Sequence, residues 1–150
     1  MKKVVIALAL CVCFLTGCGS KTETLVCTRT ASQNGMDLNF RYEVEYKGKT
    51  VAKVHTVEKI KSNAPQTLDE YKKLIEATFS TYKKIKYYES NVSIKGDTLT
   101  STTDINYSKI DTDALIKIDS ANEKIIKKGK VNVDDLKATY EAMGTTCKVK

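Results

Sequence analysis

The sequence predicts an α+β fold, in which an antiparallel β-sheet carries one long and one shorter amphipathic helix. Residues 38–46 alternate strictly between apolar and polar side chains, which is typical of a half-buried strand. Residues 67–84 carry apolar side chains at spacings of three and four, which is typical of an amphipathic helix. Turn sequences such as Asn34-Gly35 separate the β-branched runs, so neighbouring strands are expected to pair as hairpins.

The first residues have the pattern of an export signal. Lys2 and Lys3 give a positive start, and an apolar run from Val4 to Leu15 follows them. This run is too short to stay in a bilayer as a spanning helix, which takes about 20 residues. We therefore expect residues 1–17 to be a signal peptide that is removed.

The cleavage region Leu15-Thr16-Gly17-Cys18 resembles the lipobox of bacterial lipoproteins, in which the cysteine is acylated and becomes the first residue of the mature chain. The alternative is a plain signal peptide with a cysteine nearby. The lipobox interpretation predicts a lipid anchor of the palmitate type on Cys18, followed by a short tether within residues 18–24. Two or more acyl chains anchor a protein stably, so we expect the mature protein on the extracytoplasmic face of the cell membrane.

The rest of the chain has the size and charge of one basic domain. Residues 25–150 are enough for a single domain with its own core. The formal net charge is +7, and the two lysines of the signal leave +5 for the mature part. Because lysines and acids are interleaved, a solvated surface is favoured, with attraction to anionic lipid head groups as the alternative. Export and the lack of an arginine-rich motif argue against a nucleic-acid partner.

The cysteines predict one disulfide. Cys11 and Cys13 leave with the signal and Cys18 carries lipid, so Cys27 and Cys147 remain. Two thiols that remain in an exported domain usually pair, and we expect these two to join the first and last strands. The alternative is two buried free thiols, which an anaerobic source with weak oxidising machinery would favour.

The first half of the domain reads as three strands and the long helix. Strands are expected at 24–30, 38–46 and 50–61. The third strand spaces its apolar residues by three, so a bulge or a helical stretch is an alternative there. Thr67 and Glu70 have the pattern of a capping box, so the helix is expected to begin at Thr67.

The second half is expected to contain a hairpin, a final helix and a closing strand. Asn132 is the expected N-cap of the final helix, and Gly144 its stop. The expected ranges are strands at 86–94 and 98–107, an ambiguous segment at 108–119 that fits either a short helix or a strand, a helix at 133–143 and a strand at 145–149.

This order of elements resembles the YehR family of small bacterial lipoproteins. The segments that carry the resemblance are Tyr42–Lys49, Tyr82–Ile85, the threonine-rich strand near residue 100, and Glu141–Lys150. The resemblance covers nearly the whole mature chain. It implies one α+β domain anchored at the envelope, of unassigned function, and it supplies no functional residues to transfer.

The sequence contains no catalytic, metal or cofactor signature. His55 is the single histidine, so a zinc site lacks its usual ligands, and a strand-surface position is expected for it. Asp111, Asp113 and Asp119 hint at a calcium loop, but the glycine and closing glutamate of that loop are missing, so capping roles are favoured. Nucleophile and phosphate-binding motifs are also missing. We expect no enzyme and no cofactor.

Two classes of function remain. The first is an accessory interaction module that docks on another envelope protein through a sheet edge or a charged helix face. The second is a small-ligand protein that binds a sugar or peptide in a shallow site lined by Tyr87, Tyr88 and Tyr107. A domain of this size leaves little room for an enclosed pocket, so the interaction module is favoured.

Overall fold

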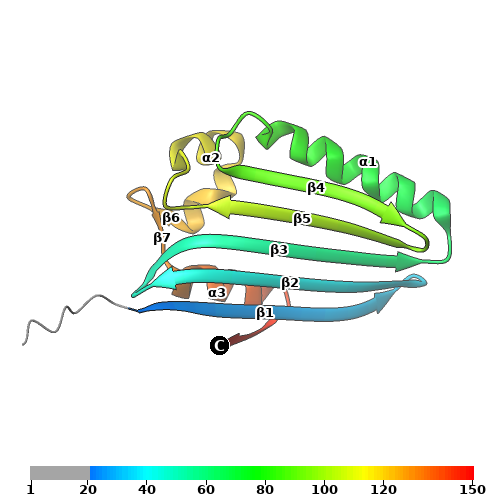
Figure 1. The fold of residues 1–150 in the computed structure, drawn as a ribbon, viewed down its shortest axis with the longest axis horizontal. Coiled ribbons are helices and arrows are strands. Elements are labelled where there is room, and N and C mark those ends of the chain that lie inside the picture. The colour runs from blue at the N-terminus through cyan, green and yellow to red at the C-terminus, as the bar shows by residue number, and fades with distance from the viewer. Residues whose placement is uncertain (1–20) are drawn as a thin grey trace, which may run out of the picture.

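The computed structural model describes residues 21–150 (Figure 1). The predicted signal peptide, residues 1–17, and Cys18 lie outside this range. The elements follow in the order β1 (Thr22–Gln33), β2 (Met36–Lys47), β3 (Thr50–Ser62), α1 (Pro65–Tyr82), β4 (Tyr88–Lys95), β5 (Thr98–Asn106), α2 (Thr112–Ile118), η1 (Ser120–Lys124, a 3-10 helix), β6 (Ile126–Lys127), β7 (Lys130–Val131), α3 (Val133–Ala142) and β8 (Thr146–Val149).

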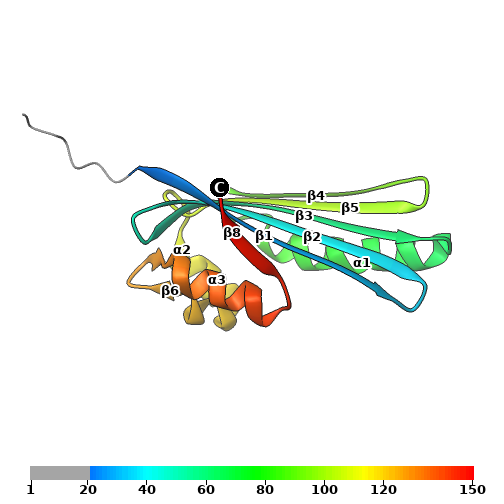
Figure 2. The same cartoon turned by 90° about the horizontal axis from the view of Figure 1, so that it is seen from below.

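The main sheet has six strands in the order β4-β5-β3-β2-β1-β8, and every neighbouring pair is antiparallel. The α-helices lie against one face, which we call the helix-bearing face (Figure 2). The opposite, open face carries no helix from residues 21–150. This confirms the predicted α+β fold with its antiparallel sheet. The ambiguous segment 108–119 forms α2, a short helix.

The alternation in β2 separates the two faces as predicted. Val44 and Tyr46 are buried beneath the helices, whereas Asn39 points to the solvent on the open face. The β2 side chains on the helix-bearing face are Leu38, Phe40, Tyr42, Val44 and Tyr46.

A bulge in β3 explains its unusual apolar spacing. Glu45 pairs with Lys53 and Tyr46 pairs with Val51, so Ala52 is an extra residue without a partner on β2. The bulge lets both Val51 and Val54 enter the core. Beyond it the strand alternates normally, and the helical alternative for this segment is wrong.

The long helix begins earlier than its capping-box pattern predicts. Its first residue is Pro65, and its N-cap, Ala64, provides no side-chain hydrogen bond. A proline has the φ angle of the first helical turn and no amide hydrogen that needs a partner, so it starts the helix without a cap. The predicted capping box of Thr67 and Glu70 is therefore wrong.

The other helix ends follow the predicted polar residues. Asn132 Oδ1 accepts a hydrogen bond from the Asp134 amide at 2.8 Å, and α3 ends before Gly144, whose φ is +84°. Asp111 caps α2 and Asp119 caps η1 through their side-chain oxygens. These bonds confirm capping roles for the two aspartates.

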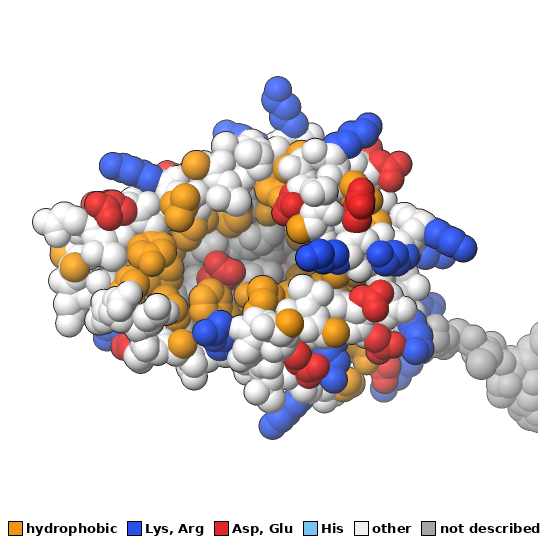
Figure 3. All heavy atoms as spheres, turned by 180° about the vertical axis from the view of Figure 1, so that it is seen from behind, with side chains coloured by type: hydrophobic (Ala, Val, Ile, Leu, Met, Phe, Trp, Pro, Cys, Tyr) orange, Lys and Arg blue, Asp and Glu red, His pale blue; other side chains and the backbone are white. Residues whose placement is uncertain are grey.

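Buried apolar side chains form two separate clusters on the helix-bearing face. The larger cluster packs against α2 and α3 and includes Leu25, Val44, Val54, Leu115, Val131, Leu136 and Tyr140. The smaller cluster packs against α1 and consists of Met36, Ile60, Leu68 and Leu99. Between the helices the face is hollowed, and hydrophobic side chains surround the hollow (Figure 3).

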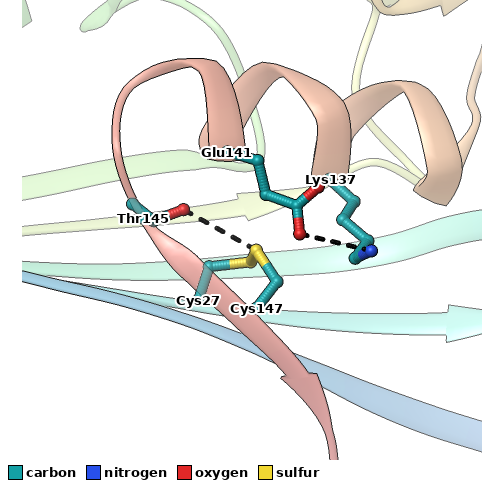
Figure 4. Close-up of a disulfide and its surroundings, with 5 residues drawn as sticks. All are labelled: Cys27, Lys137, Glu141, Thr145 and Cys147. Atoms are coloured by element: carbon teal, nitrogen blue, oxygen red, sulfur yellow. Dashed lines mark hydrogen bonds and ion pairs between the residues drawn. A yellow bond between two sulfur atoms is a disulfide. The ribbon is translucent and has the colours of Figure 1, made fainter.

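The predicted disulfide joins the first strand to the last. Cys27 of β1 and Cys147 of β8 lie directly opposite each other in the sheet and are bonded through their sulfur atoms (Figure 4). Cys27 is fully buried, and the hydroxyl of Thr145 lies 3.6 Å from the Cys147 sulfur. Because β8 is short, this bond fixes an edge strand that few backbone hydrogen bonds hold.

We expect Cys147→Ala to lower the free energy of unfolding by roughly 2 to 4 kcal/mol, because the bond closes a long loop in the unfolded chain. The separation between its two cysteines is 120 residues. Urea denaturation without reductant measures the loss, and reduction of the wild-type protein should reproduce it. Equal stability of the variant and the oxidised wild type would contradict this account.

Candidate functional site

The candidate site is the hollow between the two core clusters, where no helix of the described chain covers the sheet. The long helix α1 packs on β3, β4 and β5, whereas α3 packs on β1 and β8. The middle of the face, over β2 and part of β3, is left open to solvent. We call this hollow the central cleft.

The central cleft has a volume of about 680 Å³. Strands β1, β2 and β3 supply its floor, and the turn that follows α3 supplies one wall. Its lining residues are Arg29, Phe40, Tyr42, Glu58, Ala142, Met143, Gly144 and Thr145. Figure 3 shows an acidic side chain within the hollow, and Glu58 is the acidic residue among those that line it.

Strand register brings the floor residues together. Arg29 lies opposite Phe40, and Phe40 lies opposite Glu58, so the three form one row across β1, β2 and β3. Neighbouring strands are about 4.8 Å apart, which sets the two charged residues roughly two strand spacings from each other. An aromatic ring therefore lies between a basic and an acidic residue.

Arg29 binds the turn after α3 that forms one wall of the cleft. Its Nη1 donates a hydrogen bond to the backbone oxygen of Met143 at 2.6 Å, at the end of α3. A positive charge at the C-terminal end of a helix interacts favourably with the helix dipole. The Arg29 guanidinium also binds a backbone carbonyl that has no partner within the helix. A Cβ at Gly144 would lie 3.5 Å from Arg29 Nε, so the turn packs closely over this side chain.

Glu58 has no such partner. Its half-buried side chain makes no hydrogen bond or ion pair with any residue of the range 21–150. Burial raises the pKa of Glu58, because the ionised carboxylate loses hydration in the cleft. A carboxylate kept in this environment costs stability, which marks it as a candidate functional group.

Two pairs of stacked tyrosines lie on the helix-bearing face, and one member of each pair lies near Glu58. Tyr42 stacks on Tyr140 with ring centroids 4.3 Å apart, and Tyr82 stacks on Tyr88 at 4.8 Å. Burial, aided by the negative charge of Glu58, raises the pKa of Tyr42 to about 12. Tyr42 is therefore a neutral aromatic surface at physiological pH.

The tyrosines that the sequence proposed for a ligand site do not meet in one cavity. Tyr88 and Tyr107 pack against the larger core cluster on the helix-bearing face. Tyr87 lines a depression of about 580 Å³ on the open face. The prediction of a shallow site built from these three residues is therefore wrong.

The open-face depression differs from the central cleft because most of its charged groups form ion pairs. A hydrogen bond from Arg41 lowers the pKa of Glu43, whereas burial raises that of Glu58. The other pairs there are Lys150 with Glu43 at 3.6 Å, Lys53 with Glu45 at 3.4 Å, and His55 with Asp104 at 2.7 Å. His55 is thus a strand-surface residue, as predicted.

Metal ligands do not gather in the described part of the chain: no group of three or more His, Cys, Asp or Glu side chains within residues 21–150 is placed to hold an ion. The central cleft offers one carboxylate and two aromatic rings, without a nucleophile beside a base. This arrangement suits binding of a group with complementary charge and shape.

Sequence reasoning missed Glu58, although a signal for it was present. The apolar spacing of β3 suggested that Val57 faces the core. Strict alternation counted back from Ile60 instead directs residues 58 and 56 to the helix-bearing face, and only the bulge at Ala52 breaks that pattern. Because of this break, the sequence pattern did not reveal that Glu58 points to the helix-bearing face.

Comparisons with known proteins support the fold. A family model described as a protein of unknown function (DUF1307) matches residues 26–146. The NMR structure of the E. coli YehR protein is similar, with a TM-score of 0.58, 21% identity, and coverage of 86% of this chain and 92% of that chain. An NMR structure of a protein from Streptococcus pneumoniae TIGR4 has a TM-score of 0.53, 18% identity, and coverage of 99% and 97%. A search of curated proteins found no match.

We expect Glu58→Gln to stabilise the protein at neutral pH, because it removes a carboxylate that ionises unfavourably in the cleft. The pKa of Glu58 is raised on folding, so the wild type binds more protons folded than unfolded and loses stability as pH rises above the ordinary glutamate range. The gain should therefore be present at pH 7 and vanish in acid. Thermal melts of both proteins across pH measure it.

The matched control is Glu45→Gln on the open face. Glu45 pairs with Lys53, and both side chains are well exposed, so the control should change stability by less than about 1 kcal/mol. A lower melting temperature for Glu58→Gln at pH 7 would contradict the account of Glu58.

Proposed function

This chain belongs to the DUF1307 family of proteins of unknown function, as its resemblance to YehR predicted, and we propose that it is a lipid-anchored, non-catalytic binding protein of the bacterial envelope. Its binding site is the central cleft, and its ligand is a segment of another envelope protein. The observation that carries the proposal is the middle of the helix-bearing face, which no helix within residues 21–150 covers, and the Glu58 carboxylate in its floor, with which no residue of that range pairs.

The anchor follows from the lipobox pattern at Leu15–Cys18. Only residues 19–21 separate Cys18 from β1, and three residues reach at most about 11 Å. An acylated Cys18 would therefore hold the sheet next to the membrane surface. Among residues 21–150, no helix is both long and apolar enough to cross a membrane.

The shape of the cleft favours a protein segment over a small molecule. The hollow opens to solvent on the helix-bearing face, and hydrophobic side chains gather beside it (Figure 3). Leu38 lies two residues before Phe40 on the same face of β2 and is only partly buried, so β2 adds apolar surface beside the cleft. Exposed apolar surface around a concave centre is typical of a groove that binds a partner segment.

We expect Cys18→Ala to move the protein from the membrane fraction to the soluble fraction of the cell, because the acyl chains supply the anchoring energy. Fractionation of cells followed by immunoblotting measures the distribution. Retention of the variant in membranes, at the wild-type level, would rule out the anchor on Cys18.

Site-specific photo-crosslinking in intact cells tests the cleft as the binding site. A photoreactive amino acid at Ala142, an exposed residue that lines the cleft, should yield one dominant crosslinked protein. The yield should fall several-fold when Phe40→Asp places a second negative charge in the floor.

The control position is Lys59, which follows Glu58 directly and is exposed on the open face. A crosslinker there should not capture the same protein. Equal capture from Ala142 and Lys59, or capture from Ala142 that Phe40→Asp leaves unchanged, would contradict binding in the cleft.

A further inference from the structure

Glu58 gives the central cleft a chemical preference. It is the single acidic residue among the cleft residues, and no partner within residues 21–150 neutralises it. Leaving a half-buried carboxylate unpaired is unfavourable, whereas a cation that enters the cleft restores its lost interactions. An anionic ligand would meet repulsion at the same place.

The aromatic residues beside Glu58 favour an organic cation over a metal ion. Phe40 lies directly opposite Glu58 on β2, which brings their Cβ atoms to about 5 Å. Tyr42 follows two residues along the same strand and lines the same cleft. A cation over an aromatic face is attracted by the ring, and a guanidinium is weakly hydrated and stacks well on such faces.

Arg29 is not the cation that pairs with Glu58. Its guanidinium binds the Met143 oxygen, and Phe40 separates it from Glu58 in the row of three strands. It stands at the opposite side of the cleft floor, where its charge disfavours a second cation. An incoming basic group is therefore directed to Glu58.

The net charge of the mature chain restricts how basic the ligand is. The formal charge of +5 that remains after the two signal lysines are removed repels a strongly basic partner at long range. The preference for a cation is thus local to the cleft floor, and its surroundings are apolar. This combination fits one basic side chain set among apolar neighbours.

We propose that the partner segment inserts a single arginine or lysine side chain against Glu58, with apolar neighbours on Phe40 and on the partly buried Leu38 beside it on β2. This inference rests on the proposed function and names the chemistry of its ligand. Glu58 is the residue that determines specificity, and Phe40 and Tyr42 provide the surface on which the basic group packs.

Peptide binding to the lipidated protein in zwitterionic lipid nanodiscs tests the inference. The probes are short peptides in which leucine and phenylalanine flank a central arginine, or its neutral isostere citrulline, or glutamate. Isothermal titration should show the arginine peptide binding about tenfold more tightly than the citrulline peptide, as expected for a hydrogen bond between charged groups. The glutamate peptide should bind more weakly still.

The preference for arginine over citrulline should be lost in Glu58→Gln and kept in Glu45→Gln. Equal affinity of the two peptides, or a preference that survives Glu58→Gln, would overturn the basic-anchor inference while leaving the cleft as a binding site. If no peptide binds, the inference also fails, and crosslinking from Ala142 then decides the proposed function on its own. Melting of Glu58→Gln shows that this variant is folded.

Discussion

The incomplete cover of the helix-bearing face determines where every other feature of the domain lies. Strands β1, β2 and β3 are long, and their apolar sides need helices to shield them from water. The chain supplies α1 over one end and α3 over the other, and each organises its own core cluster. The strand residues between the two clusters stay accessible, so a cleft forms over the centre of the sheet.

The floor of the central cleft and its side formed by α3 and β8 are held by interactions that do not depend on a ligand. The disulfide between Cys27 and Cys147 fixes β8, and the hydrogen bond from Arg29 to Met143 fixes the turn before it. The stack of Tyr42 on Tyr140 ties the floor of the cleft to α3. A site prepared in this way loses little entropy when a partner binds, which favours affinity.

The sequence predicted the elements better than it predicted the cleft. Strict alternation in residues 38–46, the cap at Asn132 and the pairing of Cys27 with Cys147 are local or countable signals, and the structure confirms them. The start of α1 was missed because a proline can begin a helix without a polar cap. The position of a helix over a sheet depends on packing between distant segments, which no local pattern encodes.

Glu58 illustrates this limit. A glutamate between a valine and a lysine looks like a surface residue in the sequence. Its inward direction follows from regular alternation with the buried Ile60, which the bulge at Ala52 obscures in the sequence, and its lack of cover follows from where α1 and α3 lie on the sheet. Both facts belong to the three-dimensional structure, so the candidate site emerged only with it.

The most direct test of the central claim is carbodiimide labelling of Glu58 in intact cells, compared with labelling of the purified protein, with the exposed Glu70 as internal reference. If a partner occupies the cleft in the envelope, Glu58 should be labelled several-fold less in cells than after purification, while Glu70 reacts equally in both. Equal labelling of Glu58 in the two settings would show that the cleft is empty in the cell and would contradict the account.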